Sequence, residues 1–412
     1  MTIKLMILSR KVIGLDLLRF SMSLVMVLFH IQSLLKDSIL NRLIYNGFFA
    51  TSTFFILSGF ILTHVYHKKI QENKFSNSAF LIKRLSALYP LHILTMSLAM
   101  LIFFFLQLIA KRTFPIEIPY QSLANYTSSP GTLKLHFFDF FQYVIESVTL
   151  TQAWDYRFLF LNGASWSVSA LFFFYLTFHF FVKKIQYQKK LKTLLVCCWL
   201  TAMFPAFYFT ASQNFSSDVI GIMHRNPLFR LPDFVAGIIF YFIYLRTNLK
   251  SKRFQLLCFL IGISGFILMN ILVKVNPKQW AYLSHNGLFL FTQLSLIYSF
   301  LQIQFSNYNL QSLIERLGKA SLSVYLLHLP LISIYFIAYR LIVASTHSST
   351  ITALLINAKN IEHLSTISVF TFLILLVLIS VYLQEKIFTP IQTKLSNSLI
   401  KRKEKFKERV LG

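Results

Sequence analysis

Ten apolar stretches of about 20 residues each constrain the fold of this 412-residue chain more than any other feature. A helix of about 20 residues crosses the hydrocarbon core of a bilayer, and helices pair their own backbone groups, as a spanning segment must. The sequence therefore predicts an all-α fold, a polytopic integral membrane bundle of about ten transmembrane helices. The ten stretches are residues 15–35, 46–66, 88–110, 165–182, 192–211, 229–246, 254–274, 286–304, 320–342 and 364–384.

The distribution of charge predicts how these spans are oriented. Of the 40 Lys and Arg residues, 27 lie in the terminal segments and connections on the side of the N-terminus and 12 on the opposite side, with Arg19 inside a span. Basic loops stay in the cytoplasm, so both termini are expected there. The net charge of +26 is spread over short stretches between apolar segments. This pattern does not favour a nucleic-acid partner, which would require a clustered basic face.

The remaining composition predicts one membrane domain, residues 1–384, and a basic cytoplasmic tail, residues 385–412, that is attracted to anionic membrane lipid. The three cysteines lie inside apolar stretches, so no disulfide framework is expected. Neither a metal-spaced His/Cys set nor a Gly-rich phosphate loop is visible. Chemistry that depends on a metal ion is therefore disfavoured.

One connection, residues 111–164, is long enough to have its own structure on the extracytoplasmic side. It contains a turn cluster at 125–131 and an apolar stretch at 137–150 that is too short to cross a membrane. Such stretches are often re-entrant or interfacial, and this one is a candidate lid over a cavity. A plain connector with an amphipathic helix remains the alternative.

Arg19 and His30 are ionisable residues inside the first apolar span. Eleven residues turn a helix about three times, so both lie on one face, roughly 16 Å apart along the axis. An ionisable group at membrane depth costs at least about 2.5 kcal/mol, so it usually faces a protein interior or a wet cavity. The pair therefore predicts a functional polar face on this helix. The alternative is an Arg that reaches the headgroups and a His bonded to a neighbouring helix.

The chemistry of the two side chains suggests different roles. An imidazole can act as a general base or attack an activated acyl group itself, and the sequence leaves both roles open for His30. The planar guanidinium of Arg19 suits a phosphate or carboxylate. Arg84 could extend that anion site, whereas Lys83 beside it is expected to be a membrane anchor.

Small and polar residues in later spans are weaker candidates. Ser58 and Gly59 provide a small surface for close helix approach and a hydroxyl inside the bundle. Trp166 is typical of an interfacial anchor, and Ser167 beside it faces either headgroups or a cavity. Three further in-span histidines are expected to pack or to hydrogen-bond between helices: His92, His179 and His328.

Six motifs in order resemble the acyltransferase 3 family, membrane-integral enzymes that O-acylate cell-envelope carbohydrates. The first is Arg19, ten residues and His30, and the second is the Phe-Phe-x-Leu-Ser-Gly-Phe pattern at 54–60. The others are Leu88–Leu91, Ser165–Ser169 with Phe174 and Tyr175, Arg230–Gly237, and Ser321–His328. Two positions depart from the family pattern: Ala87 stands where a second Arg is common, and Leu171 where a Glu is common. Both changes remove polar groups from the expected cavity.

The resemblance implies transfer of an acyl group, expected to be acetyl, from cytoplasmic acyl-CoA to a hydroxyl of an envelope or exported saccharide, such as lipopolysaccharide O-antigen or exopolysaccharide. It implies catalytic roles for His30 and Arg19, and a bacterial inner-membrane location. Acetyl-CoA or another acyl-CoA would act as co-substrate, with no permanently bound cofactor. The residues expected to bind the acyl-CoA or the saccharide or glycolipid acceptor are Arg84, Ser58, Trp166, Ser167 and Arg230.

Two other functions remain open. A transporter or flippase of an anionic or glycolipid substrate would use Arg19 and His30 to line a path without making a bond. Such proteins often have two similar halves, and none are visible here. An integral glycosyltransferase would favour acidic residues in the first outer loop, where only Asp37 stands.

Overall fold

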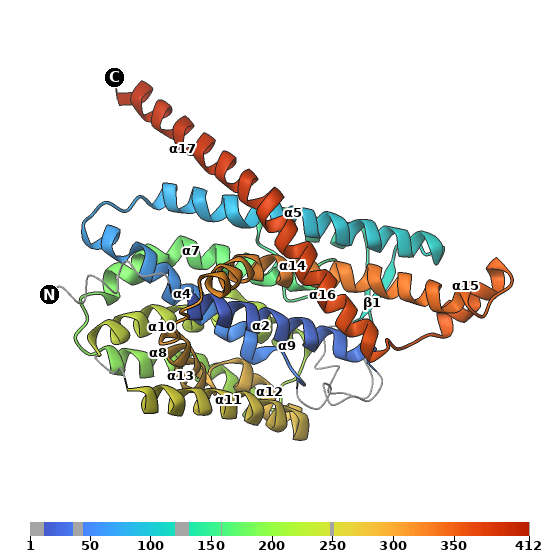
Figure 1. The fold of residues 1–412 in the computed structure, drawn as a ribbon, viewed down its shortest axis with the longest axis horizontal. Helices are drawn as coiled ribbons and strands as arrows, with labels where there is room; N and C mark the ends of the chain where they lie inside the picture. Colours follow the sequence, from blue (N-terminus) through green and yellow to red (C-terminus); the bar gives the residue numbers. More distant parts are fainter. Residues whose placement is uncertain (1–11, 36–43, 120–131, 158, 248–250, 412) are drawn as a thin grey trace.

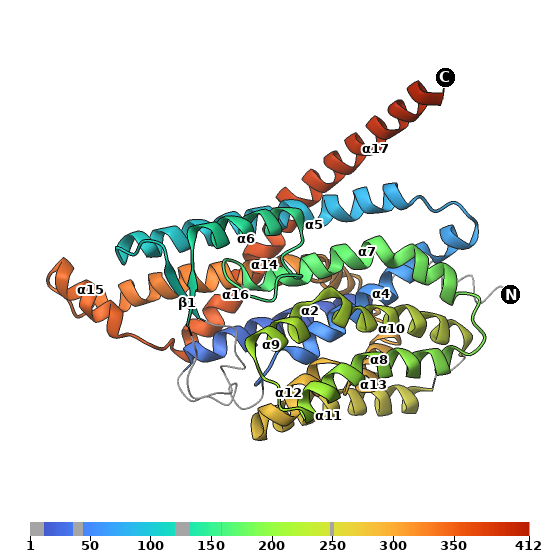
Figure 2. The same cartoon turned by 180° about the vertical axis from the view of Figure 1, so that it is seen from behind.

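The computed structural model describes residues 12–35, 44–119, 132–157, 159–247 and 251–411. These residues form an almost wholly helical bundle, and Figures 1 and 2 show its helices from two opposite sides. The helices of the first half are α2 (Ile13–Ile31), η1 (Gln32–Leu34), α4 (Phe48–Gln71), α5 (Asn77–Ile109), α6 (Phe137–Thr149), η3 (Gly163–Ser165), α7 (Trp166–Ile185) and α8 (Leu191–Ala211). Those of the second half are α9 (Ser217–Arg225), α10 (Pro227–Arg246), α11 (Lys252–Val275), α12 (Pro277–His285), α13 (Leu290–Leu301), α14 (Tyr308–Ser345), α15 (Ile351–Asn360), α16 (Thr366–Leu383), η4 (Gln384–Phe388) and α17 (Thr389–Leu411).

The described residues contain nine helical segments that are long and apolar enough to cross a membrane, which confirms the predicted fold class. The predicted span 286–304 differs from the other nine. It forms α13, a helix of 12 residues, because Gly287 adopts a φ of +108° in the turn that precedes it. Twelve residues rise only about 18 Å, less than the roughly 30 Å of a hydrocarbon core. Such a helix is too short to span a bilayer by itself.

Two glycines allow the backbones of α4 and α10 to touch. A Cβ atom added to Gly59 would lie 2.0 Å from the carbonyl oxygen of Phe234, and one added to Gly237 would lie 2.0 Å from that of Ile56. No real Cβ tolerates such a distance, so the crossing requires glycine on both helices. Gly59 therefore has the close-packing role that its motif predicts.

Helix α2, which carries Arg19 and His30, lies in the middle of the bundle beside α4, α13 and α14 (Figure 1). Its contact with α14 is close at Gly318, where an added Cβ would lie 2.4 Å from the Cβ of Asp16. Helix α4 also packs against α2. This central position surrounds both ionisable residues with other helices.

The connection 111–164 forms a small structured unit on α5. Strands β1 (Ile116–Pro119) and β2 (Thr132–Leu135) pair antiparallel, with Ile116 opposite Leu135. The predicted apolar stretch forms α6, which runs antiparallel to α5: Phe140 stacks on Phe103, and the hydroxyl of Tyr89 donates to the carbonyl of Val148 at 2.9 Å. The predicted turn cluster 125–131 lies outside the described residues.

The last span continues into the basic segment without a break. Helix α16 passes through the π-helical turn η4 into α17, which projects beyond the bundle at the end opposite α15 (Figures 1 and 2). A bidentate ion pair between Arg316 of α14 and Glu385 of η4, with distances of 2.6 and 3.0 Å, fixes this turn. The predicted tail is therefore helical, and its Lys403 donates a hydrogen bond to Ser78 at the start of α5.

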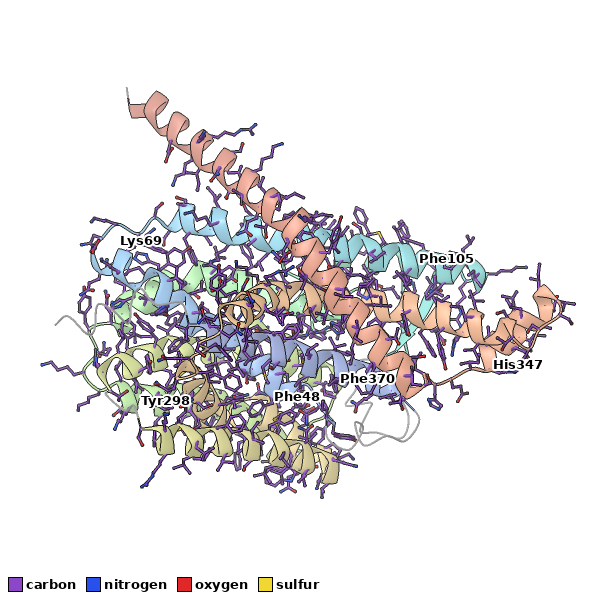
Figure 3. The ribbon with its side chains drawn as sticks, viewed as in Figure 1. Phe48, Lys69, Phe105, Tyr298, His347 and Phe370 are labelled. Carbon is purple, nitrogen blue, oxygen red and sulfur yellow. The ribbon has the colours of Figure 1, made fainter. Side chains whose placement is uncertain are left out.

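Large apolar side chains also cover the outside of the bundle. Phe105 on α5 and Phe370 on α16, both labelled in Figure 3, are 54% and 57% exposed. Soluble proteins rarely expose apolar side chains over such wide areas. These faces are suited to contact lipid chains.

Candidate active site

A cavity of about 130 Å³, called here the arginine cavity, brings together side chains from five helices. Its polar lining includes Arg19 from α2, Ser58 from α4, Arg84 from α5 and Ser167 from α7. The side chain of Arg19 is 30% exposed, and its Nη1 lies 3.5 Å from Oδ1 of Asp16. The structure thus places four of the predicted site residues on one cavity.

Two aromatic side chains hold the guanidinium of Arg84 in place. Its Nη2 donates to the hydroxyl of Tyr66 at 3.5 Å, and its guanidinium carbon lies 5.4 Å from the ring centre of Tyr66 and 5.8 Å from that of Phe80. Such cation–π contacts orient a guanidinium without neutralising it. Lys83 is exposed and lines neither of the cavities described here. Its position agrees with the anchor role.

Leu171, at the position where the family commonly has Glu, also lines the arginine cavity. The cavity therefore has an aliphatic wall where a carboxylate would otherwise stand. Ala87 does not line it. Among the described residues that line the arginine cavity, none is acidic.

A second cavity of about 460 Å³, called here the histidine cavity, is lined by His30 of α2, His224 of α9 and Trp166 of α7. The Trp166 side chain is only 4% exposed, and its ring centre lies 5.0 Å from that of His224. The prediction that Trp166 is an interfacial anchor is therefore wrong. It fails because other helices enclose the side chain where α7 begins, directly after the short turn η3.

His30 is backed by a second imidazole that does not line the cavity. The ring centres of His30 and His328 are 5.0 Å apart. Nδ1 of His328 bonds to the carbonyl of Tyr325 and must therefore carry a proton, which leaves Nε2 as an acceptor. That Nε2 is buried and has no partner among the described residues. Sequence reasoning treated His328 as a packing residue, and only the fold brings it to His30.

His224 was also missed by sequence reasoning. Its ring centre lies 4.7 Å from that of His285 of α12, whose two ring nitrogens have no hydrogen-bond partner in the part of the chain that the structure describes. Phe48 packs on His285 at 4.4 Å and lines the same cavity. Neither histidine lies in a motif that would have singled it out. The histidine cavity therefore has an imidazole on each of two walls.

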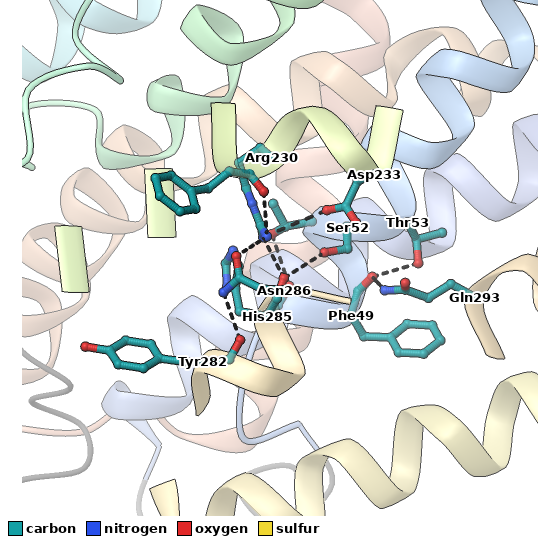
Figure 4. A network of polar contacts seen from close by, with 12 residues as sticks. Phe49, Ser52, Thr53, Arg230, Asp233, Tyr282, His285, Asn286 and Gln293 are labelled. Atoms are coloured by element: carbon teal, nitrogen blue, oxygen red, sulfur yellow. Dashed lines mark hydrogen bonds and ion pairs between the residues drawn. The ribbon is translucent and has the colours of Figure 1, made fainter. Parts of the chain in front are cut away.

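Arg230 does not line either cavity. Its side chain is fully buried, and its two terminal nitrogens donate to the carbonyl of His285 and to Oδ1 of Asn286, each at 2.6 Å (Figure 4). Asp233 lies 3.8 Å from Nη1. These contacts tie α10 to the end of α12. The structure therefore places Arg230 behind His285, which packs on the cavity-lining Phe48 and His224. Its contact with a substrate stays a prediction.

The two cavities adjoin. Thr51 of α4 and Tyr325 of α14 line both of them. Arg19 thus faces one cavity and His30 the next along the same helix, as one stripe of α2 would place them. The arrangement can hold an elongated anionic molecule with its charged end at the arginines and its other end at the imidazole.

The remaining predicted candidates are mostly bonded to backbone. Ser58 donates to the carbonyl of Phe54 at 2.8 Å, and Ser167 donates to that of Ala164 at 3.0 Å. Nε2 of His92 bonds the carbonyl of Ser147 at 2.8 Å, which joins α5 to α6, and His179 packs on Phe75. The expectation that His92 and His179 pack or bond between helices is confirmed.

A polar cleft of about 470 Å³ lies outside the spans, where the end of α6 meets the segment before α7. Arg157 pairs there with Asp155 at 2.9 Å. Burial raises the pKa of the Glu146 carboxyl, whose Oε1 accepts a hydrogen bond from Gln142 at 2.8 Å. Among the described residues, no group of three or more His, Cys, Asp or Glu side chains is arranged to hold a metal ion.

Two known proteins are similar to part of this chain. The chain is 32% identical over 124 residues to "Protein 2 in picA locus" of Rhizobium radiobacter, over 30% of this chain and 57% of that protein. It is 28% identical over 215 residues to "Acyltransferase MdmB" of Streptomyces mycarofaciens, over 49% of this chain and 48% of that protein. The matched segments thus span about half the length of these curated relatives. No solved structure matches the chain. The sequence model of the acyltransferase domain family, Acyl_transf_3, matches residues 12–384, nearly the whole chain, so the protein belongs to the acyltransferase 3 family.

Proposed function

We propose that this acyltransferase moves an acetyl group from cytoplasmic acyl-CoA to a hydroxyl of an envelope or exported saccharide, such as lipopolysaccharide O-antigen or exopolysaccharide. The observation that carries the proposal is the pair of adjoining cavities, one lined by Arg19 and Arg84 and the other by His30. In this proposal the protein lies in the bacterial inner membrane with both termini in the cytoplasm, as the bias of basic residues favours. The segment of α12 and α13 then forms the tenth crossing.

Acyl-CoA is a long, thin molecule with phosphates at one end and a thioester at the other. Arg19 and Arg84 offer planar forks of donors that suit the phosphates. The roughly 16 Å between Arg19 and His30 along α2 matches an extended arm better than a compact substrate. The acyl-CoA binds as a co-substrate and leaves after each turnover as free coenzyme A.

His30 acts as the general base in this mechanism. The acceptor hydroxyl attacks the thioester carbonyl while His30 takes its proton; a carbon–oxygen bond forms and the carbon–sulfur bond breaks. The proton then passes from His30 to the departing thiolate, so the products are the acyl ester and the coenzyme A thiol. His328 lies behind His30, where it can orient the imidazole.

The acceptor occupies the histidine cavity. Trp166 and Phe48 offer aromatic faces on which the apolar face of a sugar ring can lie, and His224 can bond a sugar hydroxyl. The volume of about 460 Å³ leaves room for a saccharide unit beside the thioester. The proposed acceptor is therefore a saccharide or a glycolipid. Membrane lipid is a further proposed partner, because it surrounds the bundle.

The test uses the purified full chain with acetyl-labelled acetyl-CoA and an envelope glycan fraction. Free thiol and labelled glycan should both appear. Replacing the proposed base, His30→Gln, should slow the formation of both products by about 10²- to 10⁴-fold. The matched control is His179→Gln, an in-span histidine that lines neither cavity, and it should keep the wild-type rate.

The same experiment separates the proposal from a transporter or flippase. If label crosses a vesicle membrane while no thiol is released and no ester forms, the protein moves a substrate without chemistry and the proposal is wrong. If His30→Gln retains the full rate of glycan labelling, acyl transfer stands and the assignment of the base fails.

A further inference from the structure

The polar cleft outside the spans has side chains of the kinds that bind carbohydrate. Trp154 and Tyr156 line it and are 40% and 38% exposed, so their rings can carry the apolar face of a sugar. Gln142 and Glu146 of α6 also line it, and their amide and carboxyl groups can bond to sugar hydroxyls. At about 470 Å³ the cleft is similar in size to the histidine cavity of about 460 Å³.

The carboxyl of Glu146 has an unused bonding position. Its Oε1 accepts a hydrogen bond from the Gln142 amide at 2.8 Å. Its Oε2 is buried and has no hydrogen-bond partner in the described part of the chain. A buried polar atom without a partner is costly, and a ligand whose hydroxyls both donate and accept can remove that cost. The carboxyl therefore favours a ligand that is rich in hydroxyl groups.

The charges of the polar cleft argue against an anionic ligand. Among the described residues that line the cleft, Arg157 is the single basic one. Its Nη2 lies 2.9 Å from Oδ2 of Asp155, and its Nη1 lies 3.8 Å from Oδ1 of Asp139. These two carboxylates neutralise the guanidinium, so a phosphate would meet no uncommitted cation there. A neutral sugar or an amino sugar suits this lining better than a phosphorylated molecule.

The polar cleft lies close to the histidine cavity. Arg157 lines the cleft and Leu159 lines the cavity, so their Cα atoms are at most about 7 Å apart. Helix α9 provides a second link, because Nη2 of Arg225 donates to the carbonyl of Tyr156 at 2.6 Å. The residue before Arg225 is His224, which lines the histidine cavity. A sugar chain with one unit in the histidine cavity can therefore place its next units in the cleft.

We propose that the polar cleft binds the sugar units next to the one that is acylated, so that the protein recognises a chain of sugars and not a single sugar. This inference rests on the proposed function, in which the connection 111–164 lies on the extracytoplasmic side, where an exported saccharide is found. The ligand class is a chain of neutral or amino sugars. Trp154 and Tyr156 pack on its rings, and Gln142 and Glu146 bond its hydroxyls.

The experiment measures acetyl transfer from labelled acetyl-CoA to envelope-glycan fragments of two sizes, single sugars and chains of three or more units, prepared by mild acid hydrolysis. The wild-type protein should use the chains with a kcat/KM at least about tenfold higher, because only they reach the cleft. Trp154→Ala should lower kcat/KM for the chains about five- to tenfold, chiefly through KM. Its kcat/KM for single sugars should equal that of the wild type.

Two further variants complete the experiment. Phe141→Ala is the matched control, because it removes a 54% exposed aromatic ring from α6 that does not line the polar cleft. It should keep the wild-type kcat/KM for both sizes. Gln142→Ala removes a polar group of the cleft and keeps the proposal testable if Trp154→Ala fails to fold. It should lower kcat/KM about two- to tenfold for the chains alone.

The outcomes separate the two proposals. If the wild-type protein labels neither the chains nor the single sugars, the proposed acyl transfer itself is wrong. If it labels both sizes with equal kcat/KM, acyl transfer stands and the cleft binds no part of the acceptor. The inference also fails if Trp154→Ala and Gln142→Ala leave the chains unaffected, or if they slow both sizes by the same factor.

Discussion

The imidazole rings of His30 and His328 lie 5.0 Å apart although the two residues are 298 positions apart in the sequence, and of the two only His30 lines the histidine cavity. His328 donates its Nδ1 proton to the Tyr325 carbonyl, which fixes its tautomer and leaves Nε2 to accept a proton. In the proposed mechanism His328 packs against the base, which needs this partner during the reaction more than during substrate binding.

The change His328→Gln should therefore lower kcat by about ten- to a hundredfold, less than the loss of the base itself. KM for acetyl-CoA should stay within a few-fold of wild type. Steady-state kinetics on the purified variant measure both. A merely structural His328 would instead reduce the unfolding temperature and leave kcat per folded molecule unchanged.

Gly59 should be essential for the packing of α4 on α10. In Gly59→Ala the new Cβ meets the Phe234 carbonyl at 2.0 Å, so backbone has to move, and overpacking of this kind costs about 1–3 kcal/mol or more. Thermal unfolding in detergent should show a lower midpoint. Gly163→Ala is the control, because its Cβ would find its nearest neighbour at an ordinary 3.6 Å. Equal midpoints for the two variants would contradict the predicted crossing.

Arg230 should matter for stability and not for substrate affinity. Arg230→Gln leaves Asp233 and the His285 carbonyl without their buried partner, and losses of this kind cost about 3–5 kcal/mol. The control Arg246→Gln removes an exposed arginine and should cost at most about 1 kcal/mol. A stable Arg230→Gln protein with a raised KM would instead support the prediction that Arg230 contacts the substrate.

The buried carboxyl of Glu146 should make stability depend on pH. Its pKa is raised in the folded protein, mainly by burial, so the folded state loses stability as pH rises from the ordinary carboxyl value through the raised one. Glu146→Gln removes this loss and keeps the acceptor for Gln142. Its unfolding temperature should match wild type near pH 4 and exceed it at pH 8.

The sequence predicts the helices of this protein well and their contacts poorly. The lengths of the apolar stretches correctly predict nine spans. They do so because the ability of a segment to cross lipid depends on the residues of that segment alone. The span at 286–304 was predicted too long, because the turn with a φ of +108° at Gly287 delays the start of α13 to Leu290. The Asn286-Gly287 dipeptide is typical of a turn, but a prediction from apolar length alone does not use this signal.

The site shows the same division between local and long-range information. Arg19, His30 and Ser58 were predicted from their cost at membrane depth or from motifs, and the structure places them on the two cavities. His224 and His328 were missed as site residues because their positions depend on which helices meet. Trp166 was misjudged because its burial depends on which helices surround the start of α7, which composition does not determine.

The central claim is that one acyl-CoA contacts Arg19 with its charged end and His30 with its thioester. Steady-state kinetics of Arg19→Gln and His30→Gln with acetyl-CoA test it most directly. Loss of a charge-assisted contact should raise KM for Arg19→Gln by about ten- to a hundredfold with kcat nearly unchanged. Loss of the base should lower kcat for His30→Gln by about 10²- to 10⁴-fold with KM nearly unchanged. An Arg19→Gln protein with wild-type KM, or a His30→Gln protein with wild-type kcat, would contradict the account.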